Sequence, residues 1–283
     1  MFDYLKLLYY LFRPRTIFLR RISNALGDNI LLTVLLPYLR KKNPGKKIIV
    51  ESPRKEIFYN HPDVDWVTDK HFKTTQRHLK PKYIITNENS DSIIHQITNY
   101  VGEKSITNPK IYLLDSEIQS IIGKYPANYL TISPTGKTKF SANRKEWGFQ
   151  NFQKLINLMP EFKFIQTGMP DDELLTGVLD ARGLNIRQTA ALLSNTILFI
   201  GLEGGLMHLT KAVGRKSAII YGGYIHPRSS AYEDDLIFSS RPACSPCYTS
   251  EKKQITCETM ICMKTILPET VADQIKLFMR ENS

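Results

Sequence analysis

Short apolar runs alternate along the chain with longer runs in which apolar residues recur at helical spacing. Near the start, residues 16–23 predict a strand, residues 30–42 a helix and residues 46–52 a second strand. Shorter runs at 65–68 and 83–86 predict further strands, and residues 90–101 predict a helix. Alternation of this kind is typical of an α/β domain with a parallel sheet.

The same alternation restarts after Gly123 and Pro126. Strands are expected at 128–133, 162–168, 197–201 and 217–223, with helices at 151–159, 187–195 and 206–213. Pro268 and Glu269 mark the start of a last helix. We therefore predict two Rossmann-like domains, residues 1–124 and 125–267, followed by a C-terminal segment, 268–283.

Composition narrows the possible partners. The 283 residues include 38 basic and 27 acidic side chains, a formal charge of +11, which favours anionic ligands such as nucleotides, phosphorylated glycans or acidic lipids. The apolar N-terminal run contains Lys6 and no small-residue cleavage site, so it does not resemble a signal peptide and we expect a cytoplasmic protein. This basic, aromatic segment is expected either to pack on the protein or to contact the inner membrane face.

A glycine turn in the second half predicts an anion-binding site. The strand ending at Gly201 is followed by Glu203, Gly204 and Gly205, and then directly by a helix that contains His208. Backbone N–H groups at such a turn approach a diphosphate closely, and the helix N-terminus favours its negative charge. The alternative is a tight turn with a packed histidine.

The turn after the first strand, Gly27-Asp28, is the second candidate site. Asp28 suits two roles: an N-cap for the helix that follows, or a carboxylate at the strand ends, where α/β sheets collect ligands.

Three segments together resemble glycosyltransferase family 9, the heptosyltransferase-like enzymes. These are NALGDNILLTVLLPYLRKKNPGKKIIVE, NRKEWGFQNFQKLI, with Lys145 and Trp147 in a Lys-x-Trp element, and GLEGGLMHLTKAVGRKSAIIYGG. They occur in the family's order between residue 20 and about residue 223.

The resemblance implies a GT-B fold, in which two Rossmann-like domains with parallel sheets face each other across a cleft. The first domain would take the acceptor and the second the nucleotide sugar, with ADP-heptose as the first donor to consider. The final helix, 268–281, would pack back on the first domain. Glu203-Gly204 stands where Asp-Ser or Asp-Thr is commoner, so the nucleotide and the sugar stay open.

Site roles follow from this resemblance. Asp28 would be the general base of an inverting transfer. Lys145 would neutralise the nucleoside diphosphate that leaves, so no catalytic metal is implied. The donor-binding set would comprise Thr135, Gly136, Lys145, Glu203, Gly204, Gly205 and His208. His226 and Arg228 would contact phosphate or acceptor, or lie in a solvated loop.

All four cysteines, Cys244, Cys247, Cys257 and Cys262, lie within one short segment. A CxxC pair followed by two more thiols suits structural zinc or iron, and free thiols or redox pairs are the alternative. The segment resembles the iron-binding one of autotransporter heptosyltransferases and predicts a small metal finger.

Three other functions fit part of the pattern. Net charge and the CxxC pair fit a nucleic-acid-binding zinc-finger protein, although the basic residues are dispersed and no nucleic-acid module is recognised. A sugar-nucleotide epimerase or a non-catalytic binding subunit would share the two-domain fold. The preferred interpretation is a glycosyltransferase of surface polysaccharide, lipopolysaccharide or protein glycosylation.

Overall fold

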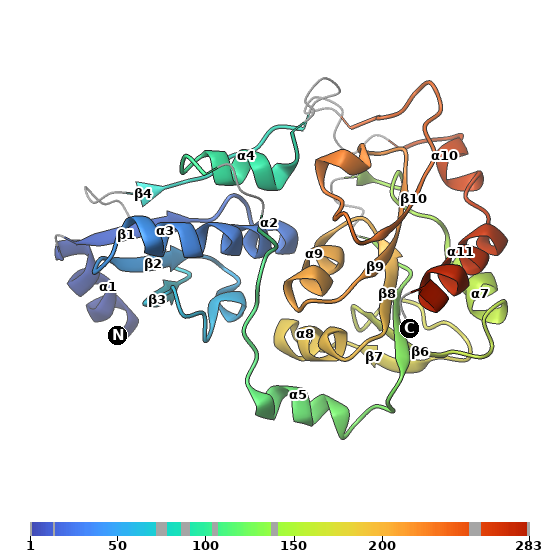
Figure 1. The fold of residues 1–283 in the computed structure, drawn as a ribbon, viewed down its shortest axis with the longest axis horizontal. Coiled ribbons are helices and arrows are strands. Elements are labelled where there is room, and N and C mark those ends of the chain that lie inside the picture. The colour runs from blue at the N-terminus through green and yellow to red at the C-terminus, as the bar shows by residue number, and fades with distance from the viewer. Residues whose placement is uncertain are drawn as a thin grey trace.

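The computed structural model describes residues 2–13, 15–71, 78–85, 91–103, 107–136, 141–248 and 256–281. Two α/β domains lie side by side, and the described part of the chain passes from one to the other through the segment that carries helix α5 (Asp115–Ile122) (Figure 1). The predicted α/β class with two parallel sheets is confirmed.

The first domain has a four-stranded sheet in the order β3-β2-β1-β4, and its strand pairs are all parallel. The strands are β1 (Thr16–Arg20), β2 (Lys47–Glu51), β3 (Trp66–Thr68) and β4 (His78–Leu79). The strand expected at 83–86 does not form among the described residues, and His78–Leu79 pairs with β1 instead.

The second domain has six parallel strands in the order β10-β9-β8-β5-β6-β7. Read from β7, this order is that of a dinucleotide-binding Rossmann sheet. The strands are β5 (Tyr129–Ser133), β6 (Lys163–Gly168), β7 (Leu179–Arg182), β8 (Leu198–Leu202), β9 (Ser217–Gly222) and β10 (Leu236–Ser239). Every residue of β5, β8 and β9 is buried, as expected for central parallel strands covered on both faces.

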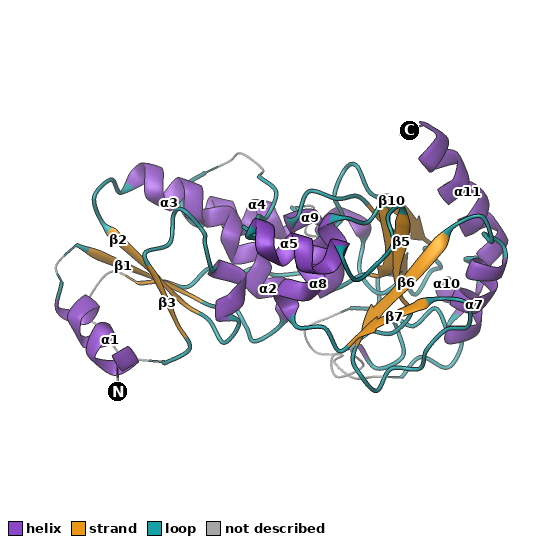
Figure 2. Cartoon of the chain, turned by 90° about the horizontal axis from the view of Figure 1, so that it is seen from below, coloured by secondary structure: helices purple, strands orange, loops and turns teal. Residues whose placement is uncertain are grey.

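Helices cover the sheets of both domains (Figure 2). In the first domain they are α1 (Phe2–Phe12), α2 (Leu26–Leu31), α3 (Leu36–Lys42) and α4 (Ile93–Asn99). In the second they are α7 (Phe149–Asn157), α8 (Ile186–Ser194), α9 (Gly205–Ala212), α10 (Ile261–Lys264) and α11 (Pro268–Glu281). None of the helices in the described part of the chain is long and apolar enough to cross a bilayer.

The helix predicted at 30–42 is divided. Residues Leu32–Leu35 form a 3-10 turn, η1, between α2 and α3. Pro37 lies in the first turn of α3 and has no N–H to donate to Thr33, so the regular hydrogen-bond ladder is interrupted there.

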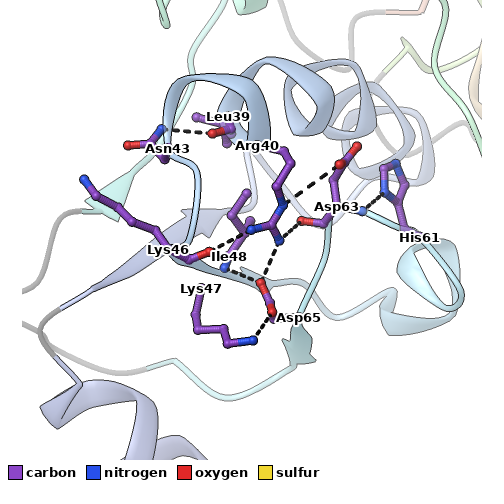
Figure 3. Close-up of polar contacts among 9 residues, drawn as sticks. All are labelled: Leu39, Arg40, Asn43, Lys46, Lys47, Ile48, His61, Asp63 and Asp65. Carbon is purple, nitrogen blue, oxygen red and sulfur yellow. Dashed lines mark hydrogen bonds and ion pairs between the residues drawn. The ribbon is translucent and has the colours of Figure 1, made fainter.

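A polar network fixes α3 against the first sheet (Figure 3). The Asp65 carboxylate accepts hydrogen bonds from Arg40 (2.7 Å), Lys47 (2.6 Å) and the Ile48 backbone N–H (2.9 Å). Arg40 also donates to the Lys46 carbonyl oxygen at 2.7 Å. Burial by itself raises the pKa of Asp65, but these hydrogen bonds bring it below its ordinary value. The ionised carboxylate therefore joins helix and strands in the domain that carries Asp28.

The two domains are in direct contact. Helix α2 packs on α9, and one apolar cluster includes Leu31 and Leu35 of the first domain with Leu209 and Ala212 of the second (Figure 1). Helix α5, which precedes the predicted boundary at residue 124, packs on α8 and contributes Ile121 to a second-domain cluster.

The position predicted for the last helix is wrong. Helix α11 packs on α7 and β10 of the second domain and lies far from the first (Figure 1). Its apolar face, Val271, Ala272 and Ile275, is buried in the second-domain core. Lys276 adds an ion pair with Glu161 at 3.0 Å, so the helix completes the domain that precedes it in sequence.

Candidate active site

Four predicted site residues, and Tyr83 with them, follow the strands at which the order of each sheet reverses. In the first sheet, Asp28 follows β1 and Tyr83 follows β4, which are neighbours. In the second sheet, Thr135 and Gly136 follow β5, and Glu203 follows its neighbour β8. Ligands of open α/β sheets bind at such points, because the loops after the two strands diverge there.

Asp28 lies in the first turn of α2, partly buried, and both of its carboxylate oxygens accept hydrogen bonds. The Ser23 hydroxyl donates to Oδ2, and the Tyr83 hydroxyl donates to Oδ1 at 2.7 Å. The N-cap position of α2 belongs to Ala25, so the capping alternative for Asp28 is wrong. Burial and the neighbouring carboxylate raise the pKa of Tyr83, which therefore stays a protonated donor. Two side chains thus hold one carboxylate in a fixed orientation.

Gly27 permits the close approach of the two domains. A Cβ atom at this position would lie 2.8 Å from His208 Cδ2 and 3.6 Å from the Gly205 Cα. On the facing helix, a Cβ at Gly205 would lie 3.0 Å from the Leu26 Cβ. The glycines at the starts of α2 and α9 therefore allow these two helix ends to pack against each other.

His208 lies within this contact and is 5% exposed. Its Nδ1 shares a hydrogen bond of 2.8 Å with the Tyr232 hydroxyl. Burial lowers the pKa of His208 to about 4, although the negative charges of Glu203 and Asp28 act in the opposite direction. The imidazole is neutral at neutral pH, so it can offer a hydrogen bond but no charge to a phosphate.

Glu203 and Lys145 form an ion pair at the C-terminal end of β8. Burial by itself raises the pKa of Glu203, but the Lys145 ammonium opposes it and holds the pKa below its ordinary value. The ammonium also lies 4.9 Å from the centroid of the Tyr224 ring. Ser230 donates a weak hydrogen bond of 3.4 Å to the other Glu203 oxygen. A cation, a carboxylate and a neutral histidine are therefore grouped at the start of α9.

The remaining donor candidates border this group. Thr135 and Gly136 are exposed, and a Cβ at Gly136 would lie 3.3 Å from Leu202 Cδ1, so their loop adjoins the end of β8. Gly204 is the N-cap residue of α9, and a Cβ there would meet no atom within 4 Å. The space beside the Gly204 backbone is open to a ligand.

His226 and Arg228 lie in the loop after β9. His226 accepts a hydrogen bond from the Arg228 backbone N–H at 3.1 Å, and its Nε2 lies 2.7 Å from an Arg241 nitrogen. The same loop continues to Ser230 and Tyr232, which contact Glu203 and His208. The loop therefore reaches the site through Ser230 and Tyr232, whereas the His226 ring bonds to Arg228 and Arg241.

The four cysteines line one cavity of about 450 Å³, together with Arg144 and Met260. Cys244 is exposed, Cys262 is buried, and Cys247 and Cys257 are intermediate; none forms a disulfide. No three His, Cys, Asp or Glu side chains within the described ranges converge as metal ligands would. The donor set suits zinc or iron chemically, and binding would require the thiols to draw together.

A family model decides the class of the protein. The model of glycosyltransferase family 9 (heptosyltransferase) matches residues 73–257, more than half of the chain. The chain belongs to glycosyltransferase family 9. It is therefore a glycosyltransferase, and neither the nucleic-acid-binding nor the epimerase alternative gains support. Asp28 precedes the matched residues, so the family match does not cover it.

Solved structures share the fold of this family 9 chain. A family 9 glycosyltransferase from Veillonella parvula is 17% identical, with a TM-score of 0.71 over 94% of this chain and 98% of that one. The iron-containing dodecameric glycosyltransferase TibC from enterotoxigenic E. coli is 14% identical, with a TM-score of 0.75 over 95% and 77%. ADP-heptose lipopolysaccharide heptosyltransferase II of E. coli is 13% identical, with a TM-score of 0.71 over 94% and 99%. A search of curated proteins gave no match.

Sequence reasoning missed the aromatic side chains of the site. Tyr83 lies in an irregular segment before α4, while Tyr224 and Tyr232 lie in the loop after β9. Nothing in the local pattern marks these residues, because their partners are distant in sequence. What the three share is tertiary: each packs in or against the apolar cluster that joins the two domains.

Proposed function

We propose that this protein is an inverting glycosyltransferase that moves heptose or a related sugar from a nucleoside-diphosphate donor, with ADP-heptose as the first candidate. The acceptor would be a hydroxyl of a bacterial surface glycan, lipopolysaccharide or glycoprotein. One observation carries the proposal: Gly27, the neighbour of Asp28, packs against His208 of the other domain, and the charges of Asp28, Glu203 and Lys145 all act on that His208 ring. Family membership and the solved ADP-heptose complex of TibC support the donor class.

In this mechanism Asp28 accepts the proton of the acceptor hydroxyl as its oxygen attacks the anomeric carbon. The bond from that carbon to the phosphate oxygen breaks, and the nucleoside diphosphate leaves with the electron pair. Attack from the face opposite the leaving group inverts the anomeric centre. Ser23 and Tyr83 orient the carboxylate, and each carboxylate oxygen retains a lone pair for the incoming hydroxyl.

Lys145 would leave part of its interaction with Glu203 to neutralise the diphosphate. The backbone N–H groups of Gly204 and Gly205, at the N-terminus of α9, would bind the same phosphates. Thr135 and Gly136, in the loop after the neighbouring strand β5, would border the nucleotide as well. His226 and Arg228 are candidates for the acceptor or the outer phosphate.

The cysteine segment would hold one structural zinc or iron ion. Four thiolates leave no open coordination position for a substrate, so the ion would stabilise the segment and take no part in the transfer.

Helix α1 would bring the first domain to an anionic membrane surface at the cytoplasmic face. Leu5, Leu8, Tyr9 and Phe12 are exposed and recur at the spacing of one helix face. Arg13 and Arg15, also exposed, follow that face and supply charge complementary to acidic lipid. The buried side of α1 carries Tyr10, which stacks on Trp66 with 5.7 Å between the ring centroids.

The substitution Asp28→Asn tests the proposal. A thermal-shift screen with ADP, GDP, UDP and CMP sugars identifies the donor, since a ligand at a hundred times its Kd adds about 2.7 kcal/mol of stability. With that donor, the variant should bind within about twofold of wild type and lose about 10²- to 10⁴-fold in transfer rate.

Binding of the donor and transfer are thus measured separately. A variant that transfers sugar at the wild-type rate would remove Asp28 from the reaction. A wild-type protein that binds no nucleotide sugar would refute the proposed donor site.

A further inference from the structure

The two residues before Lys145 both bond to the cysteine segment. The Asn143 side chain donates to the Cys257 carbonyl oxygen at 2.8 Å and accepts from the Cys257 N–H at 2.8 Å. This paired arrangement fixes the amide group and the Cys257 backbone relative to each other. Because Cys257 is 114 residues further along the chain, the contact is tertiary and not part of a local turn.

Arg144 bonds to the other half of the same segment. It is 5% exposed, and its guanidinium donates to the Cys247 carbonyl oxygen at 3.3 Å. Its Nε donates to the Ser141 carbonyl oxygen at 3.1 Å. Asn143 and Arg144 therefore connect to both cysteine pairs, Cys247 before and Cys257 after residues 249–255.

The Tyr224 ring joins this region to the nucleotide site. The Arg144 guanidinium and the Lys145 ammonium each lie 4.9 Å from its centroid. Tyr224 is held by Tyr248, which donates its backbone N–H at 2.9 Å and packs edge-on at 5.5 Å. Tyr248 directly follows Cys247, so the ring under Lys145 is attached to the cysteine segment as well.

We propose that Asn143 and Arg144 are positioning residues, which hold Lys145 in its phosphate-binding place by anchoring it to the four-cysteine segment. This inference rests on the proposed role of Lys145 at the donor diphosphate. It assigns the cysteine segment a part in donor affinity in addition to its own stability. Any change that loosens the segment would then weaken nucleotide binding through Lys145.

A double-mutant cycle tests this coupling. Calorimetry measures the Kd of ADP, GDP and UDP for wild type, Asn143→Ala, Lys145→Ala and the double variant. If Asn143 acts through Lys145, Asn143→Ala weakens binding about fivefold in wild type and has little effect once Lys145 is absent. If Asn143→Ala only disturbs the fold, it should weaken nucleotide binding by the same factor in wild type and in Lys145→Ala.

Gln153→Ala is the matched control. The Gln153 amide also bridges a backbone, accepting from the Thr176 N–H at 2.8 Å and donating to the Thr176 carbonyl oxygen at 3.1 Å. It lies on α7 of the same domain, so its loss should lower Tm comparably and leave the nucleotide Kd unchanged.

Thiol reactivity gives a reciprocal measurement. Since coupling between two sites is mutual, bound nucleotide should slow the reaction of the cysteines with Ellman's reagent in wild type and not in Asn143→Ala.

Failure takes distinguishable forms. A wild-type protein that binds none of the three nucleotides overturns the proposed function and this inference with it. Wild-type binding that is unchanged in Asn143→Ala, or weakened equally with and without Lys145, overturns the positioning role alone.

Discussion

The substitution Gly27→Ala tests whether close contact between the two domains is needed for function. The added Cβ would lie 2.8 Å from His208 Cδ2. The His208 ring has little room to retreat, because it is buried and bonded to Tyr232 at 2.8 Å. Either the hydrogen bond is lost or the two helix ends move apart.

The expected size of the effect follows from this geometry. Carbon atoms in contact normally lie about 3.5–4.0 Å apart, so a displacement of roughly 0.7 Å or more is required. Overpacking of this kind costs about 1–3 kcal/mol, and the better helix propensity of alanine offsets roughly 0.5–1 kcal/mol. The middles of these two ranges give a net loss of about 1 kcal/mol, which corresponds to a Tm lower by about 2–4 °C. A shift approaching 1 Å between Asp28 and the donor would reduce kcat by about 10- to 100-fold.

Differential scanning fluorimetry and a transfer assay with a saturating donor measure both effects. The control is Gly123→Ala, at the C-cap of α5, where the backbone is αR and the nearest atom to the new Cβ is the Gln119 carbonyl oxygen at 3.6 Å. The free energy of unfolding of this control should equal that of wild type or exceed it by up to about 1 kcal/mol, so its Tm should not fall. If Gly27→Ala retains wild-type Tm and kcat, the close contact between Gly27 and His208 is not needed for stability or transfer.

Three further predictions concern the cysteines, α1 and the buried histidines. Elemental analysis of anaerobically purified protein should give about one zinc or iron ion per chain, and the metal content should be lower in Cys247→Ser. A wild-type protein that is fully folded without metal would exclude the structural ion. Wild type should co-sediment with phosphatidylglycerol vesicles but not with phosphatidylcholine vesicles, and Phe12→Ser should bind the phosphatidylglycerol vesicles less. Two results would contradict a membrane-binding face on α1: equal binding of both lipids, or wild-type oligomers that the substitution Phe12→Ser dissociates. Burial lowers the pKa of His61 and His208 from 6.5 to about 4, so the unfolded chain binds more protons between these values. Their contribution to stability is complete above pH 6.5 and is lost as pH falls towards 4, so a Tm equal at pH 7 and pH 5 would contradict this assignment.

Hydrophobic periodicity was sufficient to predict most of the fold. Buried parallel strands such as Leu198–Leu202 are apolar throughout, and amphipathic helices such as Phe149–Asn157 carry their own face pattern. The errors fall where tertiary pairing decides the structure. Strand β4 is two residues long and forms through pairing with β1, and α11 carries an apolar face that either domain could have accepted.

The turns that carry the site residues could be predicted from the sequence, but the side chains that bond to these residues could not. Asp28, Glu203 and the glycines follow strands and are recognisable by residue type. Their interactions depend on side chains distant in sequence: Tyr83 is 55 residues from Asp28, and Lys145 is 58 residues from Glu203. Short-range pattern contains no information about such pairs. Residue type alone also does not show what Gly27 contributes, which is the absence of a side chain at a contact between two helices.

The adjacency of Gly27 and Asp28 has a geometric explanation. Successive residues of an α-helix point about 100° apart, so one residue of the first turn can face a neighbouring helix while the next faces elsewhere. Gly27 faces His208 of the second domain, and Asp28 turns to Ser23 and Tyr83 of its own domain. Packing at the glycine therefore sets the distance between the domains one residue away from the carboxylate. For the base role that we propose, this placement is favourable: errors in the position of one domain relative to the other are smallest beside the contact that fixes their separation.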